Sequence, residues 1–188
     1  MTAPIKRAPR ADGQRNRAKL LEAAAPLAGP DGDELSLDQV ARDAGVSIAT
    51  LYRHFPTREA LLLEISRQDA VTHKARADQL RATHDPVDAL GLWLQEMGRY
   101  GLTRPGMSRA FRAAANDAVG DEVYKTTTDA LGSLMTAGQK EGAIRTDLSA
   151  DDVLLALCGL WELKDSPDAR AQCDRLSRLI LDGLKQST

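Results

Sequence analysis

The chain has few aromatic residues and no long apolar run. Phe, Trp and Tyr make up 4% of its 188 residues, so we expect an interior built mainly from Leu, Ala and Val. No apolar run is long enough to span a bilayer. The basic start, MTAPIKRAPR, lacks the apolar stretch of a signal peptide. We therefore expect a cytoplasmic protein with no membrane partner.

The sequence also lacks the residue groups on which enzymes and metal sites depend. Cys158 and Cys173 are not at metal-ligand spacing, and a structural disulfide is not expected in a cytosolic chain. Cys158 is expected to pack within an apolar helix, with redox sensing as the alternative. Asp69 and His73 are one helical turn apart but lack an evident third ligand. With no nucleophile–base pair and no phosphate-binding glycine loop, we expect no metal, no cofactor and no enzymatic activity.

Positive charge is concentrated at the N-terminus. Residues 1–19 carry six basic side chains against Asp12 alone, a balance of +5, and the chain as a whole carries −2, so the remainder carries −7. A basic arm on a weakly acidic body is typical of a DNA-binding protein that docks by one end. The alternative is a solvated tail with no role in binding. The six basic residues are Lys6, Arg7, Arg10, Arg15, Arg17 and Lys19.

Residues 35–65, LSLDQVARDAGVSIATLYRHFPTREALLLEI, have the pattern of two short helices joined by a tight turn, with a third helix close behind. Ser36 and Ser47 are placed to cap the first two helices, because a serine hydroxyl accepts from the free amides of a first helical turn. Gly45 stands where a helix ends, since glycine enters the left-handed conformation without a steric cost. Apolar residues recur at helical spacing on either side of it. The pattern predicts a helix-turn-helix whose second helix can enter the DNA major groove.

Five groups of residues in this segment carry a family resemblance: Val40-Ala41, Ala44-Gly45-Val46-Ser47, Thr50-Leu51-Tyr52, His54-Phe55 and Arg58-Glu59-Ala60-Leu61-Leu62. The segment resembles the N-terminal DNA-binding domain of the tetracycline-repressor (TetR) family. The resemblance is dense over residues 15–65, and beyond them it rests on the number and layout of the helices. The chain departs from the family pattern at Ala49, where the family often has glycine. It also departs at Pro26, where the first helix should end early or kink.

The expected fold is all-α with about nine helices. Pro and Gly fall between periodic segments, and strand-like runs of Val, Ile and Thr are missing. We expect a helix-turn-helix domain with a basic N-terminal arm over residues 1–60. A helical effector-binding and dimerisation domain should occupy residues 61–188. The expected helices are 14–27, 37–44, 47–55, 58–81, one that opens at 85–86, one that opens at Pro105, 122–139, 150–164 and one that opens at Ser166.

Double-stranded DNA is the expected partner. The resemblance implies DNA contacts by Thr50, Tyr52 and His54, and a phosphate contact by Arg58, for which a solvated surface charge is the alternative. We expect Arg53 to read a base, because its planar guanidinium can bond bidentately to guanine. A phosphate contact is an equally good interpretation of Arg53.

Four smaller side chains complete the predicted DNA contacts. Ser36 and Ser47 are helix caps whether or not DNA is present, and either can also offer a hydroxyl or amide to a phosphate. Ile48 and Ala49 offer small apolar contacts to a thymine methyl.

A symmetric dimer is expected, because one short helix reads too few base pairs while two copies about one DNA turn apart (~34–36 Å) read a palindrome. The resemblance implies that the last two helices form a four-helix interface with their copies. Trp161 favours this assignment, since large aromatic rings are common interface anchors. The alternative is that these residues fill the core of a single chain. The interface candidates are Leu154, Leu157, Cys158, Trp161, Leu176, Leu179 and Ile180.

The resemblance also implies a small-molecule effector bound inside the second domain, which shifts the reading helices through the fourth helix. The ligand is not named by the sequence. An ordinary core is the alternative for each candidate residue, and a protein partner in place of a ligand is the alternative function. The pocket candidates are Trp93, Met97, Tyr100, Phe111, Asn116 and Met135.

Overall fold

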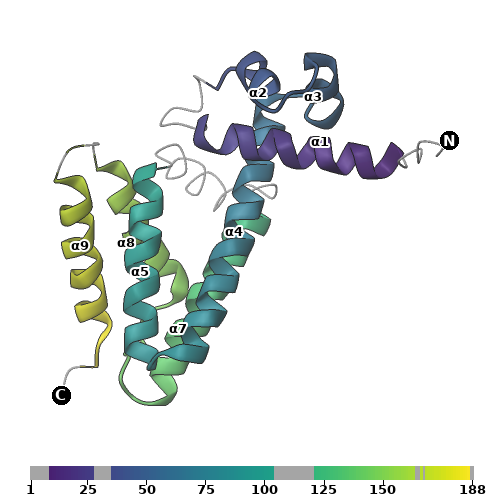
Figure 1. The fold of residues 1–188 in the computed structure, drawn as a ribbon. Coiled ribbons are helices and arrows are strands. Elements are labelled where there is room, and N and C mark those ends of the chain that lie inside the picture. Colours follow the sequence, from purple (N-terminus) through teal and green to yellow (C-terminus); the bar gives the residue numbers. More distant parts are fainter. Residues whose placement is uncertain (1–8, 28–34, 104–120, 164–165, 167, 187–188) are drawn as a thin grey trace. The chain divides into compact units, whose positions relative to one another are not determined.

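A computed structural model describes residues 9–27, 35–103, 121–163, 166 and 168–186 of the chain. Within these ranges the chain forms α-helices and two short 3-10 helices and contains no strand, so the expectation of an all-α fold is confirmed (Figure 1). The expected helix that opens at Pro105 lies outside the described residues. None of the described helices is both long and apolar enough to cross a membrane.

The chain divides into two compact units, Met1–Ser66 and Arg67–Thr188. The first unit contains α1 (Pro9–Ala24), α2 (Leu37–Asp43), α3 (Ile48–His54) and the start of α4 (Arg58–Thr83). The second contains the rest of α4, α5 (Pro86–Thr103), α7 (Asp121–Lys140), α8 (Ala150–Cys158) and α9 (Ala169–Leu184).

Helix α1 differs from its prediction at both ends. It begins at Pro9, five residues earlier than expected, and a proline fits there because the first helical turn needs no amide donor. The α-helix ends at Ala24, and Ala25–Leu27 form a 3-10 helix that contains Pro26. The predicted early end at Pro26 is therefore confirmed.

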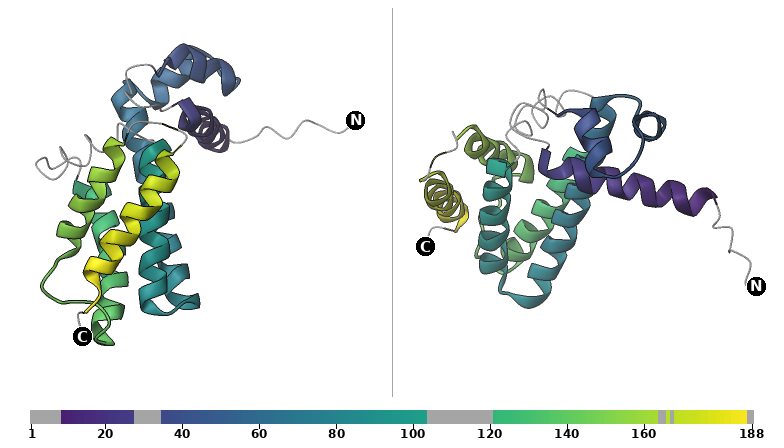
Figure 2. Two further views of the ribbon diagram at one scale, coloured as in Figure 1. Left: turned by 90° about the vertical axis from the view of Figure 1, so that its left-hand side faces the viewer. Right: turned by 45° about the horizontal axis from the view of Figure 1, so that its top comes forward.

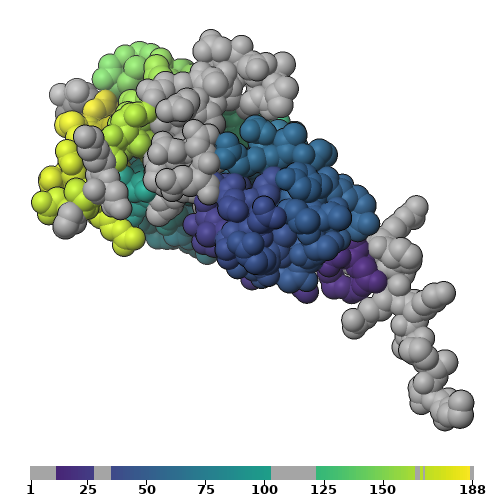
Figure 3. All heavy atoms as spheres, turned by 90° about the horizontal axis from the view of Figure 1, so that it is seen from above, coloured from purple at the N-terminus to yellow at the C-terminus, as the bar shows by residue number. Residues whose placement is uncertain are grey.

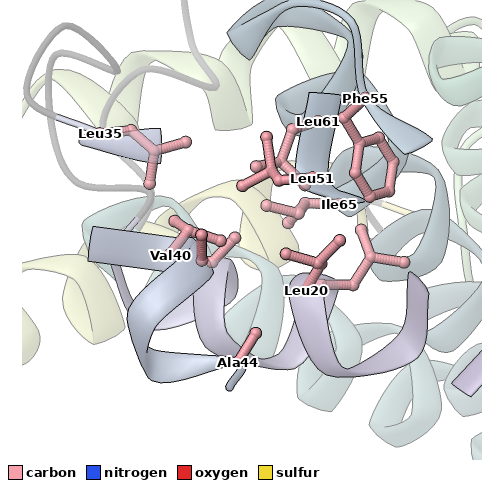
Figure 4. Packing of buried hydrophobic residues seen from close by; sticks show 11 residues of the cluster. Leu20, Leu35, Val40, Ala44, Leu51, Phe55, Leu61 and Ile65 are labelled. Carbon is pink, nitrogen blue, oxygen red and sulfur yellow. The ribbon is translucent and has the colours of Figure 1, made fainter. Parts of the chain in front are cut away.

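The core of the first unit joins the three short helices to α4. Leu20 of α1, Val40 of α2, Leu51 of α3 and Leu61 of α4 are fully buried and pack together (Figure 4). Burial of one such side chain contributes about 1.5–3 kcal/mol. The cluster consists of Leu20, Leu21, Ala24, Leu35, Val40, Ala41, Ala44, Leu51, Phe55, Leu61 and Ile65.

In the second unit, α5 packs against α7, α8 and α9, and α8 also packs against α7 and α9 (Figures 1 and 2). Trp161 packs closely against α5 at Gly101. A Cβ atom on Gly101 would lie 1.6 Å from Trp161 Cδ1, so only glycine leaves room for this ring. Trp161 Nε1 donates to the Met97 carbonyl at 3.0 Å.

Helix α8 is shorter than predicted. The Ser149 capping box with Asp152 starts it at Ala150 as expected, but the α-helix ends at Cys158 and a 3-10 helix, Gly159–Glu162, follows. The expected extension to residue 164 is therefore wrong. Tertiary packing accounts for the change, because the 3-10 turn carries the Trp161 ring that bonds to α5.

Candidate functional site

The turn between α2 and α3 forms as its sequence predicts. Ser36 Oγ accepts from the Gln39 amide at 3.3 Å, and Ser47 Oγ accepts from the Thr50 amide at 3.2 Å. Gly45 has a φ of 65°, the left-handed conformation that ends α2. These local contacts hold α3 at a fixed angle to α2, as a helix-turn-helix requires.

Helix α3 has a buried side and an exposed side. Leu51 and Phe55 are buried in the core, whereas Ile48, Ala49, Tyr52 and Arg53 are exposed. Tyr52 is 50% exposed although its ring is large. The Tyr52 phenol and the guanidinium of the next residue, Arg53, are therefore both available on the outer side of α3. Residues of α2, α3 and the start of α4 form one continuous surface in Figure 3, where they are blue.

The other predicted DNA-contact residues lie around this exposed side. Ser36 and Ser47 cap their helices and are also exposed to solvent. Thr50 is half-buried, and its hydroxyl lies 2.9 Å from Ser47 Oγ. Arg58 is half-buried at the first position of α4. The next residue, Glu59, accepts hydrogen bonds from its own backbone amide and from the Thr57 side chain. These bonds lower the pKa of Glu59, so its carboxylate stays charged.

His54 is placed differently from its neighbours on α3. Its Nε2 is buried and has no hydrogen-bond partner among the described residues. Its Cε1 lies 3.9 Å from where a Cβ atom on Gly13 of α1 would be. In this conformation His54 Nε2 faces the interior of the unit, where it is not available to a phosphate.

The predicted pocket residues that the structure describes belong to the interior of the second unit. Trp93, Met97 and Met135 are buried, and Tyr100 is half-buried. Phe111 and Asn116 lie outside the described residues. A groove of about 330 Å³ between α5 and α9 is lined by none of the four described pocket candidates; its lining includes Asp88, Gln95, Asp174 and Arg178.

A polar cluster on α4 and α5, outside the predicted pocket set, surrounds Tyr100. Tyr100 Oη donates to Asp69 Oδ2 at 2.7 Å, and its ring stands edge-on to the His73 ring with the centroids 4.4 Å apart. His73 Nε2 is buried and has no partner in the described part of the chain. Burial lowers the pKa of His73, an effect that Asp69 and Glu96 oppose. The four-residue spacing of Asp69 and His73 is the sequence signal for this cluster, since it places both side chains on one face of a helix.

The predicted interface residues fall into two groups. Leu154, Leu157, Cys158 and Trp161 are buried within the single chain. Leu176 and Ile180 are half-buried, and Leu179 is 67% exposed. Leu155, which was not among the candidates, is 65% exposed on α8. The signal for Leu155 was present, since α8 carries more apolar residues than one buried face requires.

Comparison with known proteins places these features in a family. Residues 20–65 match the family described as bacterial regulatory proteins of the tetR family, and residues 85–186 match the C-terminal domain of SbtR-like transcriptional regulators. The chain is 32% identical over 186 residues to the HTH-type transcriptional repressor KstR of Mycolicibacterium smegmatis, covering 90% of this chain and 89% of that protein. The chain belongs to the TetR family. It is a DNA-binding transcriptional regulator.

Solved structures of this family have the same fold. A TetR regulator from Streptomyces coelicolor is 35% identical with a TM-score of 0.70, over 92% of this chain and 99% of that one. A TetR regulatory protein from Mycobacterium vanbaalenii is 29% identical with a TM-score of 0.67, over 94% of this chain and 99% of that one. RolR in complex with resorcinol is 19% identical with a TM-score of 0.65, over 93% of this chain and 90% of that one, a likeness of fold.

Proposed function

We propose that this TetR-family regulator is a repressor that binds a palindromic operator as a homodimer and is released by a small-molecule effector. The exposed side of α3 carries the proposal. Tyr52 and Arg53 project from a helix that is held by buried Leu51 and Phe55 and capped by Ser47. A rigid helix with an exposed guanidinium and phenol is suited to contacts with base edges and phosphates.

Selection of bound sequences from random DNA tests the operator part of the proposal. The purified full-length chain should enrich a palindrome whose half-sites are about one helical turn apart. Enrichment of a sequence without symmetry would contradict binding as a dimer. Failure to enrich any sequence at low salt would contradict operator binding altogether.

The exposed apolar residues of α8 and α9 support the homodimer. Leu155 and Leu179 are both about two-thirds exposed, although leucine is among the residues most often buried. Helices α8 and α9 pack together, so a second copy can cover residues of both helices at once. We propose an interface that includes Leu155, Leu176, Leu179 and Ile180. In this proposal the buried residues of this region pack within one chain and hold the interface helices in place. They are Leu154, Leu157, Cys158 and Trp161.

Polar groups beside the buried apolar residues of α5 support an effector site. Trp93 and Met97 supply apolar walls, and Tyr100, Asp69 and His73 supply groups that can orient a ligand. The buried His73 Nε2 has no partner among the described residues, and a ligand hydroxyl can bond to it as donor or acceptor. The Asp69 carboxylate near His73 disfavours an anionic ligand, whereas the Glu96 carboxylate is paired with Arg76. A hydroxyl group can meet the hydrogen-bonding needs of His73, so we propose an uncharged effector that carries a hydroxyl. RolR, which has the same fold, was solved in complex with resorcinol.

A thermal-shift screen tests the effector site. Neutral phenols and alcohols should raise the melting temperature, because a ligand that binds only the folded state stabilises it. Carboxylic acids with the same carbon skeletons should have a smaller effect. If no compound stabilises the protein while DNA binding is intact, a protein partner becomes the better explanation for the second unit.

A further inference from the structure

The side chain of Arg17 on α1 joins the end of α3 to α4. Its guanidinium Cζ lies 5.2 Å from the centroid of the Phe55 ring, and its Nη2 lies 2.9 Å from Glu64 Oε1. Phe55 is the C-cap residue of α3 and is buried. One arginine therefore contacts the residue at which α3 ends and a carboxylate of α4.

A second contact from α1 reaches the same end of α3. Gly13 lies one helical turn before Arg17, and a Cβ atom there would be 3.9 Å from His54 Cε1. Residues four apart share one face of a helix. The same face of α1 thus passes over His54 and Phe55, the last helical residue of α3 and its cap.

These contacts bear on the role of the basic N-terminal arm. Arg17 is one of the six basic residues near the N-terminus whose charge favours attraction to phosphates. In the structure its guanidinium pairs with Glu64 and its Cζ lies over the Phe55 ring; the side chains of Arg17 and Glu64 are 39% and 19% exposed. A cation held in this way is oriented toward the protein, and much of its field is cancelled at short range.

We propose that Arg17 is a positioning residue for DNA recognition, which fixes the C-terminal end of α3 through Phe55 and Glu64 and does not itself neutralise a phosphate. The inference rests on the DNA-binding function described above. Loss of the guanidinium should leave α3 folded on Leu51 but less well fixed at its far end. Base readout should then suffer, while general attraction to DNA should remain.

The test compares Arg17→Met with Lys19→Met in the full-length chain. Both changes remove one positive charge from α1, but Lys19 is exposed. Binding is measured by fluorescence anisotropy over a series of salt concentrations. The probes are the duplex selected from random DNA and a scrambled duplex of equal length. Circular dichroism confirms that each variant is folded at the temperature used.

We expect Arg17→Met to weaken binding to the selected duplex about 10-fold, with little change on the scrambled duplex. The slope of log K against log salt should be unchanged, because no phosphate contact is lost. A slope shallower by about 0.9, with equal losses on both duplexes, would make Arg17 a phosphate contact and overturn the proposal.

Glu64→Gln provides the second arm, which stays informative if Arg17→Met does not fold. We expect Glu64→Gln to weaken binding to the selected duplex as well. The double variant, with both Arg17→Met and Glu64→Gln, should bind this duplex no more weakly than the single variant that has the lower affinity. If Arg17 met a phosphate, removal of a nearby negative charge would strengthen binding. Wild-type protein that binds no duplex would refute the DNA-binding function and this inference with it. Wild-type binding with both variants unchanged would refute this inference alone.

Discussion

Replacement of Trp161 by alanine tests whether this ring belongs to the core of one chain or to a dimer interface. The ring is 2% exposed, it lies against Gly101, and its Nε1 donates to the Met97 carbonyl at 3.0 Å. Truncation of a buried tryptophan costs about 3–5 kcal/mol through lost burial and the cavity that remains. The hydrogen bond from Nε1 to the Met97 carbonyl is lost in the same truncation.

The predicted cost can be converted into a melting temperature. For a chain of this length each kcal/mol lowers the melting temperature by about 2–4 °C, so Trp161→Ala should lower it by roughly 6–20 °C. The assay is thermal unfolding followed by circular dichroism at one protein concentration, since a dimer melts at a temperature that depends on concentration. Trp161→Phe keeps most of the volume and should lose less. An unchanged melting temperature together with monomers in sedimentation would refute the core assignment.

Three further predictions use different measurements. Arg53→Ala should leave the fold intact and relax base preference at one operator position by about 1–3 kcal/mol; an equal loss on every duplex would make Arg53 a phosphate contact. Leu155→Ser with Leu179→Ser should produce folded monomers in sedimentation, because both side chains are exposed in the single chain, and a dimer that persists would exclude this face. Burial lowers the pKa of His73 in the folded state. As pH falls below about 6.5, the unfolded chain therefore takes up a proton on His73 before the folded chain does, and the free energy of unfolding decreases. Stability of His73→Asn should fall less over that range, and parallel pH profiles of the two proteins would refute the assignment.

The helix-turn-helix was predictable because its signals are local. Ser36, Gly45 and Ser47 each act on the backbone within three residues, so their roles did not depend on the rest of the chain. The same holds for Pro26, which ends the α-helical part of α1 wherever that helix packs. Signals of this kind predicted the start of α2 at Leu37, and they predicted the start of α3 one residue before its observed position at Ile48.

The direction of individual side chains was less predictable, because it depends on distant partners. His54 was expected on the DNA side with Thr50 and Tyr52, but its position follows from α1, which starts five residues earlier than the periodicity indicated. Trp161 was favoured as an interface anchor because it is large and aromatic. Its burial depends on Gly101, sixty residues earlier in the chain, where the absence of a side chain leaves room for the ring.

Helix α4 is where the two halves of the proposed function can be coupled. It is one continuous helix from Arg58 to Thr83, with Leu61 and Ile65 in the core of the first unit and Ala77 and Leu80 buried in the second. The proposed effector groups, Asp69 and His73, lie about three to four turns along the same helix from Arg58. A ligand can shift the regulator only by as much as it binds one conformation better than another. We therefore expect effector contacts with α4 to matter more for release than contacts with α5 alone, and His73→Asn to weaken release more than it weakens ligand binding.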